Sequence, residues 1–172
     1  MSEPDKIDEG FYLNAYNRLG LLGINNVADL GCGVGPFVRI MTWKNQKPGV
    51  YWGVDASLDN IETARRLYPG WRFSYGDFLT DKVKMEFVKF DAFLILKVLE
   101  YLDEDLGLLQ SLPSGRPVVF SAPSFEAPGH RRWFSGEADL KERYSPILNL
   151  ELMGRYVDPK GKAWFMNTAR RW

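Results

Sequence analysis

The feature that most constrains the fold of this chain is a glycine-rich turn between an apolar segment and a helix start. Residues 27–37 read VADLGCGVGPF. The glycines Gly31, Gly33 and Gly35 let the backbone turn sharply and approach a ligand closely. Pro36 then suits the first turn of a helix, where a missing N–H costs little. The segment therefore predicts a buried strand, a turn and a helix, as at a nucleotide-binding site in a Rossmann-like sheet.

The surrounding acids and the glycine spacing bear on which nucleotide binds. A second apolar segment, residues 50–54, ends in Asp55, whose carboxylate can accept hydrogen bonds from ribose hydroxyls. A dinucleotide site uses the spacing G-x-G-x-x-G, whereas this chain has G-x-G-x-G with Pro36 at the place of the third glycine. Asp29 would repel a pyrophosphate but can hold an ammonium group. An NAD-dependent oxidoreductase is therefore disfavoured.

The pattern D-x-G-x-G-x-G over residues 29–35 resembles the first motif of the class I S-adenosylmethionine-dependent methyltransferases. The resemblance implies S-adenosylmethionine as cofactor and S-adenosylhomocysteine as product. It assigns the cofactor's amino group to Asp29, the ribose to Asp55 and the adenine amino group to Asp77, which follows the third strand. The cofactor-binding residues that it implies are Asp29, Gly31, Cys32, Gly33, Gly35, Asp55, Ala56, Asp77, Phe78 and Lys97.

Each of the three acids also has an ordinary structural role open to it. Asp29 can cap the N–H groups of the loop, Asp55 can cap the next helix, and Asp77 can stabilise a turn. However, acids follow three consecutive strands, and together they favour a ligand-binding role more strongly than any one of them alone. Ligands in open parallel sheets bind at these carboxyl ends.

Residues 96–102, LKVLEYL, resemble the V-L-E-H segment of methyltransferases similar to the ubiquinone-biosynthesis O-methyltransferases. Tyr101 replaces the usual histidine, and Lys97 replaces a residue that is more often neutral. A cation beside the cofactor sulfonium is unfavourable, so Lys97 either points away or meets an acidic substrate. The sequence lacks the Asn/Asp-Pro-Pro-Tyr motif of enzymes that methylate DNA bases or protein glutamine. DNA and protein glutamine are therefore disfavoured as substrates.

Residues 129–135, GHRRWFS, resemble the H-x-R-x-F-[ST] segment of the same family. His130, the only histidine, is a candidate general base for a hydroxyl nucleophile. Its alternative role is to shape the loop through backbone hydrogen bonds. Ser135 is expected to cap the next helix. The catalytic candidates are His130 and Tyr101, and the substrate-binding candidates are Tyr12, Tyr16 and Arg132.

Composition narrows the class of protein. The chain has 22 acidic and 22 basic residues. It therefore has no net positive charge that would attract nucleic acid or an anionic membrane. A single cysteine, Cys32, excludes a disulfide framework and a cysteine-cluster metal site, and we expect no metal. No apolar run approaches the length of a membrane span, and the N-terminus lacks the features of a signal peptide. We expect a cytoplasmic protein.

Strand and helix patterns alternate along the first two thirds of the chain. The expected strands are 27–30, 50–54, 71–75, 92–96 and 118–122, followed by a hairpin of 148–156 and 162–168. The expected helices are 7–22, 36–43, 57–68, 81–88, 103–112 and 135–144. Alternation predicts an α/β fold: a Rossmann-like doubly wound sheet of five parallel strands and a C-terminal antiparallel hairpin, covered by helices as a three-layer sandwich.

We expect one methyltransferase domain over residues 1–172. Its parts are an N-terminal helix over the site (1–23), a cofactor-binding core (24–123) and a substrate-side region (124–172). The expected reaction is methyl transfer to an oxygen or nitrogen of a small molecule, without nucleic acid or membrane. The two segments that could cover the site, the first helix and the loop with His130, are short. A second copy in a homodimer or a partner protein would therefore close the site. The alternatives are an RNA- or protein-directed methyltransferase and a non-catalytic binding or activator module.

Overall fold

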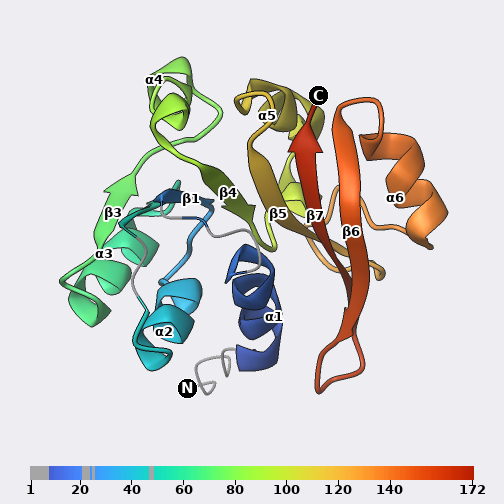
Figure 1. The fold of residues 1–172 in the computed structure, drawn as a ribbon. Helices are drawn as coiled ribbons and strands as arrows, with labels where there is room; N and C mark the ends of the chain where they lie inside the picture. The colour runs from blue at the N-terminus through green and yellow to red at the C-terminus, as the bar shows by residue number, and fades with distance from the viewer. Residues whose placement is uncertain (1–7, 21–23, 25, 47–48) are drawn as a thin grey trace.

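A seven-stranded sheet organises the protein, which a computed structural model describes over residues 8–20, 24, 26–46 and 49–172. The strand order is β3-β2-β1-β4-β5-β7-β6 (Figure 1). The strands are β1 (Asn26–Leu30), β2 (Val50–Asp55), β3 (Arg72–Tyr75), β4 (Ala92–Ile95), β5 (Pro117–Pro123), β6 (Leu148–Val157) and β7 (Ala163–Arg171). The first five are parallel, and β7 runs antiparallel between β5 and β6. The predicted fold class is confirmed.

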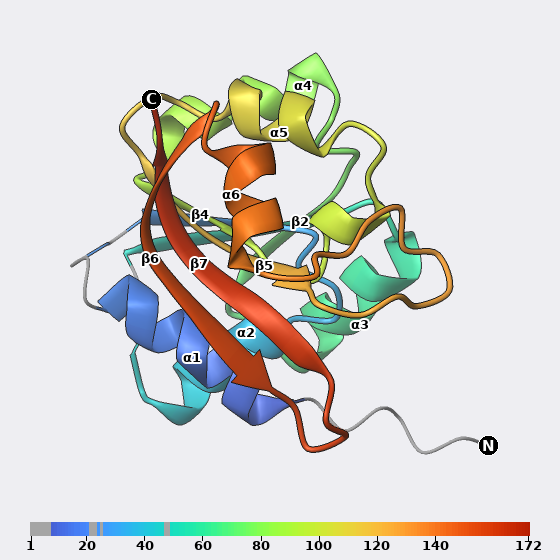
Figure 2. The same cartoon turned by 90° about the vertical axis from the view of Figure 1, so that its right-hand side faces the viewer.

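Helices cover both faces of the sheet. Figures 1 and 2 show α1, α2 and α3 on one face and α4, α5 and α6 on the other, which gives the predicted three layers. The α-helices among the described residues are α1 (Glu9–Gly20), α2 (Pro36–Trp43), α3 (Leu58–Leu67), α4 (Asp81–Lys84), α5 (Asp105–Ser111) and α6 (Glu137–Tyr144). Two short 3-10 helices are η1 (Phe87–Lys89) and η2 (Leu99–Tyr101).

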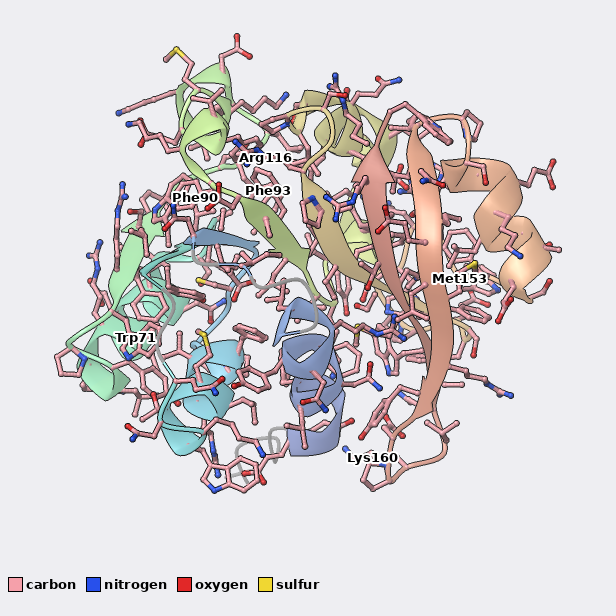
Figure 3. All side chains as sticks on the ribbon, viewed as in Figure 1. Trp71, Phe90, Phe93, Arg116, Met153 and Lys160 are labelled. Atoms are coloured by element: carbon pink, nitrogen blue, oxygen red, sulfur yellow. The ribbon has the colours of Figure 1, made fainter. Side chains whose placement is uncertain are left out.

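Alternating side chains along the strands build one hydrophobic core on each face. In β1, Ala28 and Leu30 join the core beneath α5 and α6, whereas Val27 joins the core beneath α1 to α3. Phe90 and Phe93 belong to the first of these cores (Figure 3). Since both faces are covered, every residue of β4 and β5 is buried, as expected for central strands of a parallel sheet.

The register of the strands brings their carboxyl ends to one edge. Leu30 of β1 lies beside Val54 of β2, and Asp29 lies beside Leu94 of β4. The residues that follow these three strands must therefore meet, since parallel strands of matched register end together.

Three local expectations differ from the structure. The fourth helix is a single turn that continues as η1, with Met85 and Glu86 between them. Asp103 does not cap α5; its exposed carboxylate pairs with Arg131 at 3.2 Å. Ser135 does not cap α6 either, because its N–H and hydroxyl both donate to the carboxylate of Asp139.

Other local expectations are confirmed. Ser57 caps α3, with its hydroxyl oxygen accepting from the N–H of Asn60 at 3.3 Å. The described part of the first helix buries the predicted stripe Phe11, Ala15 and Leu19. The outer ends of that predicted helix, 7 and 21–22, lie outside the described residues.

Candidate active site

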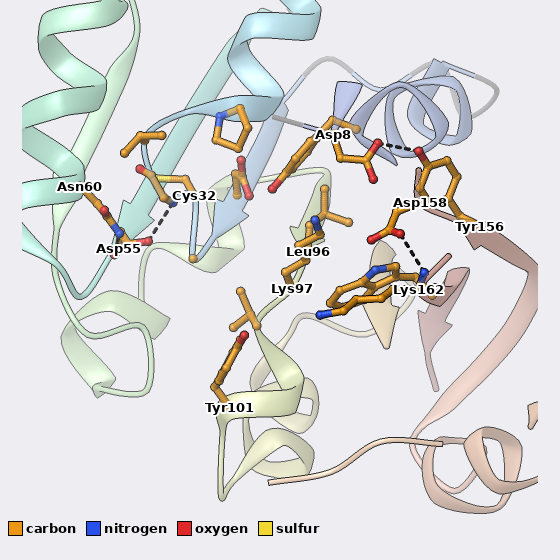
Figure 4. A pocket seen from close by; sticks show the side chains of 18 of the residues that line it. Asp8, Cys32, Asp55, Asn60, Leu96, Lys97, Tyr101, Tyr156, Asp158 and Lys162 are labelled. Carbon is orange, nitrogen blue, oxygen red and sulfur yellow. Dashed lines mark hydrogen bonds between the residues drawn. The ribbon is translucent and has the colours of Figure 1, made fainter. Parts of the chain in front are cut away.

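A pocket of about 1500 Å³ opens at the carboxyl ends of β1, β2 and β4 (Figure 4). The start of α1, the segment after β5 and the turn between β6 and β7 complete its wall. Eight of the ten predicted cofactor residues line it: Asp29, Gly31, Cys32, Gly33, Asp55, Ala56, Phe78 and Lys97. Gly35 and Asp77 are not among the lining residues.

The glycine turn is tied to the end of β2. The backbone N–H groups of Gly31 and Cys32 donate to the carbonyl oxygen of Val54 at 2.8 and 3.1 Å. Gly31 has a φ of 78°, and a Cβ built on it would overlap the side chain of Val98. Only glycine therefore fits this position without strain. Because Gly31 has no side chain, its backbone directly lines the pocket.

Asp55 fixes the turn and the start of α3 together. Its Oδ2 accepts from the N–H of Gly33 at 2.8 Å, and its Oδ1 accepts from the N–H of Ser57 at 2.9 Å and from the amide of Asn60 at 3.2 Å. Figure 4 shows Asp55 and Asn60 side by side at one end of the pocket. A carboxylate has about four lone-pair directions, so Asp55 can also accept from ribose hydroxyls.

Asp29 is buried at the end of β1, where its Oδ2 accepts a hydrogen bond from the hydroxyl of Tyr51 at 2.7 Å. Burial raises the pKa of Asp29 to about 7; the Tyr51 hydrogen bond opposes this rise, and the negative charge of Asp55 adds to it. A buried carboxyl group facing a pocket is suited to a cationic ligand group, because the cation restores the charged form.

A family model described as a methyltransferase domain matches residues 28–112, which run from β1 to the end of α5. This segment contains the glycine turn, Asp29 and Asp55. This part of the chain, just under half of its 172 residues, is a methyltransferase domain of the class I S-adenosylmethionine-dependent type.

Solved structures share the fold of this methyltransferase at low sequence identity. The methyltransferase domain of bacterial CtHen1-CN is 19% identical, with a TM-score of 0.71, over 96% of this chain and 100% of that one. The N-methyltransferase NodS of Bradyrhizobium japonicum WM9, solved with S-adenosylhomocysteine, is 16% identical, with a TM-score of 0.70, over 98% and 89%. Magnesium protoporphyrin IX methyltransferase of Synechocystis PCC 6803, solved with bound cofactor, is 16% identical, with a TM-score of 0.69, over 99% and 86%. A search of curated proteins gives no match.

The raised pKa of Asp29 predicts that cofactor affinity depends on pH. An ammonium group binds the carboxylate form, so binding lowers the pKa of Asp29 and releases a proton when pH is near or below 7. We expect the affinity for S-adenosylhomocysteine to fall about tenfold between about pH 8 and about pH 6. Calorimetry in two buffers of different ionisation enthalpy measures both the affinity and the released proton. In Asp29→Asn the affinity is lower and this pH dependence is absent; a wild-type affinity that stays constant contradicts the assignment.

The predicted adenine-binding acid lies outside the pocket of the methyltransferase. Asp77 is exposed, and its Oδ1 accepts from the N–H of Leu79 at 2.8 Å, which is the turn-stabilising role. Its neighbour Phe78 is buried and does line the pocket. The adenine contact of Asp77 stays a prediction.

His130 and Tyr101 both line the pocket and contact each other. The Nδ1 of His130 lies 3.3 Å from the carbonyl oxygen of Phe125, and the rings of His130 and Tyr101 meet edge to face at 5.2 Å. If Nδ1 carries the proton donated to that carbonyl, Nε2 is free of a proton and can act as a base. Burial raises the pKa of Tyr101, so at neutral pH its hydroxyl is a donor and not a base.

The three substrate-binding candidates are placed differently. Tyr12 lines the pocket, and burial raises the pKa of its hydroxyl. Tyr16 does not line it, and its hydroxyl donates to Gln46. Arg132 lies away from the pocket in an ion pair of 2.5 Å with Asp105, because that fully buried carboxylate needs cationic partners.

Several lining residues were missed from the sequence. The turn between β6 and β7 contributes Asp158 and Lys162, and the neighbouring strand ends contribute Tyr156 and Trp164. The hydroxyl of Tyr156 donates to Asp8 at 2.5 Å, which links this hairpin to the start of α1. The hairpin was predicted, but its position against the pocket depends on the pairing of Trp164 with Pro123 at the end of β5.

Further groups bear on the chemistry. Burial raises the pKa of the Cys32 thiol well above its usual range, so this thiol stays protonated and unreactive. Among the described residues there is no group of three or more side chains that could hold a metal ion. In the same part of the chain, no helix is long and apolar enough to cross a membrane.

Proposed function

We propose that this protein transfers the methyl group of S-adenosylmethionine to a hydroxyl group of a small molecule. The observation that carries the proposal is that the glycine turn, Asp29, Asp55 and His130 all line one pocket. In the reaction an O–CH₃ bond forms as the S–CH₃ bond breaks, and the sulfonium becomes a neutral thioether. The proton of the hydroxyl passes to Nε2 of His130.

The chain's own residues have two tasks in this reaction. Asp29, Asp55 and the turn hold the cofactor, and the aromatic and polar residues across the pocket hold the acceptor in line with the methyl group. Alignment supplies much of the rate, since the sulfonium is already activated. A base contributes because a hydroxyl must lose its proton.

An RNA-directed activity finds less support in the placement of the basic residues. Arginines of the C-terminal third are engaged in ion pairs: Arg131 with Asp103, Arg132 and Arg143 with Asp105, and Arg170 with Glu151. These pairs neutralise charges that an RNA-binding surface would present to phosphates. We expect no salt-sensitive binding of RNA.

The first test is calorimetric titration of the purified chain with S-adenosylhomocysteine and, separately, with NAD. Binding of S-adenosylhomocysteine alone supports the proposal. Binding of neither ligand leaves a non-catalytic module as the better reading. Turnover is then measured as S-adenosylhomocysteine formed from S-adenosylmethionine in the presence of a panel of phenols, alcohols and amines.

His130→Asn is expected to lower kcat by about 10²–10⁴-fold, because the proton acceptor is lost. Asparagine retains a side-chain group that can bond the carbonyl of Phe125, so the loop keeps its shape. Affinity for S-adenosylhomocysteine should not change. If kcat survives and only the thermal stability drops, His130 is a loop residue and not the base.

A further inference from the structure

The loop that carries His130 has no helix or strand of its own. It spans residues 124–136, between the end of β5 and the start of α6. Such a loop keeps a side chain in a fixed place only where hydrogen bonds and packing hold it to regular elements. A catalytic base must be held within about 0.5 Å of its working position. The anchors of this loop therefore decide whether His130 can serve as the base.

Arg132, two residues after His130 in this loop, is anchored at three points. Its Nη1 donates to the carbonyl oxygen of Leu99 at 3.2 Å, and its Nη2 donates to that of Asp103 at 3.3 Å. Nη1 also pairs with Oδ1 of Asp105 at 2.5 Å. The side chain is only 15% exposed, so these interactions are largely shielded from water. One guanidinium thus ties the loop to both η2 and α5.

A backbone hydrogen bond joins the same loop to the same 3-10 helix. The N–H of Arg131 donates to the carbonyl oxygen of Glu100 at 2.6 Å. One bond alone leaves two segments free to pivot about it, whereas a second bond beside it stops that rotation. The bond from Arg132 to Leu99 is this second bond. Removing the guanidinium therefore leaves the loop attached to η2 but free to turn.

The helix η2 also carries a ring that contacts His130. Tyr101, its last residue, lines the pocket (Figure 4), and the centroid of its ring lies 5.2 Å from that of the imidazole. The ring of Phe125 lies 5.6 Å from the imidazole, and its carbonyl oxygen lies 3.3 Å from Nδ1. Because a carbonyl can only accept, a hydrogen bond here requires the proton on Nδ1 and leaves Nε2 as the acceptor.

We propose that Arg132 is a positioning residue that fixes the loop against η2 and so holds the imidazole of His130 in the orientation and tautomer of a base. This inference rests on the proposed function, because it deepens the role of His130 in the same site. Arg132 does not line the pocket, so it acts through His130 and not on a ligand. Its effect on the rate is large, because a misplacement of about 1 Å can cost about 10²-fold.

Arg143 provides a matched control. Its Nε and Nη2 donate to the same carboxylate, that of Asp105, at 2.9 and 2.6 Å. It lies on α6, and within the described part of the chain its side chain makes no hydrogen bond to η2 or to the loop of His130. Arg132→Met and Arg143→Met therefore each leave Asp105 with one arginine, but only Arg132→Met releases the loop.

The test reads the tautomer of His130 directly. His130 is the only histidine, so the ring signals of the untagged chain need no further assignment. Nitrogen-15 spectra distinguish protonated from unprotonated ring nitrogens, and they are compared at one pH for the wild type and both Met variants. We expect the ratio of Nδ1-protonated to Nε2-protonated imidazole to fall by about twofold to tenfold in Arg132→Met, the range for the loss of one hydrogen bond. Arg143→Met should keep the wild-type ratio.

Turnover gives a second measurement, with any acceptor that the wild type methylates. Arg132→Met should lower kcat by about 10- to 100-fold and leave the KM for S-adenosylmethionine within about twofold, because only the base is displaced. Arg143→Met should keep kcat within about twofold of wild type. Thermal unfolding should occur at lower temperature in both variants, since each removes a partner of the buried Asp105. Lost stability alone therefore cannot produce the difference in kcat.

A second pair of variants serves if Arg132→Met does not fold. Arg132→Lys keeps a positive charge beside Asp105, but lysine has a single nitrogen in place of the guanidinium fork that reaches three acceptors. Arg143→Lys is its control. The same tautomer ratios and rates are compared, with the same expected directions.

The outcomes distinguish this inference from the proposed function. The inference is overturned if the variant at Arg132 keeps the wild-type tautomer ratio, or if the variant at Arg143 changes the ratio or kcat as much. It also fails if His130→Asn lowers kcat and the variant at Arg132 does not. If His130→Asn keeps the wild-type kcat, the proposed function fails, and the tautomer ratio still decides whether Arg132 holds the ring.

Discussion

Asp55→Ala is expected to lower the affinity for S-adenosylhomocysteine by at least about 100-fold. Two losses add in this variant. The glycine turn loses the charge-assisted bond between the N–H of Gly33 and Oδ2. The cofactor loses the acceptor that we propose for its ribose hydroxyls. Hydrogen bonds to a charged group contribute about 1.5–3 kcal/mol each, so two of them account for the expected loss. Calorimetric titration measures it directly.

The matched control is Asp59→Ala. Asp59 is an exposed acid in the first turn of the same helix, α3, and it does not line the cofactor pocket. Its removal should leave the affinity within about twofold of wild type. Asp55→Asn is the informative intermediate, because it keeps an acceptor oxygen and removes the charge. If Asp55→Ala binds S-adenosylhomocysteine as well as Asp59→Ala does, Asp55 is a helix-capping acid and the ribose contact lies elsewhere.

Asp105→Ala is expected to reduce the free energy of unfolding by about 3–5 kcal/mol, the largest stability effect that we expect from a single substitution in this chain. Asp105 is fully buried. It accepts from Arg143 at 2.9 and 2.6 Å and from the hydroxyl of Tyr144 at 2.9 Å, and it pairs with Arg132. Removing this one carboxylate leaves cationic and polar groups without their partner. Urea unfolding followed by far-ultraviolet circular dichroism measures the loss.

Asp103→Ala is the control for Asp105→Ala, because Asp103 is exposed and its ion pair with Arg131 is solvated. We expect a change below about 1 kcal/mol. A loss for Asp105→Ala that is no larger would mean that the two arginines are stabilised by solvent and not by this carboxylate.

The same carboxylate predicts how stability responds to acid. Burial acts to raise the pKa of Asp105, but hydrogen bonds from Arg143 and Tyr144 and the charges of Arg132 and Arg143 lower it below its ordinary value. A lowered pKa in the folded state means that the unfolded chain binds protons more readily. The stabilisation is therefore present above about pH 4 and is lost as pH falls through the folded-state pKa. In Asp105→Ala the urea midpoint should fall less steeply over that acidic range.

The layers of the fold were predictable because they follow from local sequence. Apolar runs separated by Ser57, Pro69 and Gly70 mark strand and helix boundaries without reference to distant residues. The errors arose where a residue's partner is distant or depends on exact geometry. Ser135 suits a cap by type, yet its hydroxyl donates to Asp139 instead.

The two ends of the pocket differ in the same respect. The lining residues around the glycine turn were largely predictable, because the turn and the acid of the next strand have a fixed spacing in the sequence. The other end of the pocket was not, because Phe125, Lys162 and Trp164 come together only through the pairing of β5 with β7. Arg132 matches a family motif, but in the structure its guanidinium pairs with the buried carboxylate of Asp105 and does not line the pocket.

Because β7 lies between β5 and β6 in the sheet, these three strands are not synthesised in the order in which they pair. When β6 is synthesised, its neighbour in the sheet, β7, has not yet been made. Until β7 arrives, β5 is an open edge seven residues long, all of them buried in the finished protein. Exposed apolar edges of this kind recruit other chains. The nascent protein is thus most prone to aggregation in the interval before its seventh strand, and slow translation of residues 163–171 would lengthen that interval.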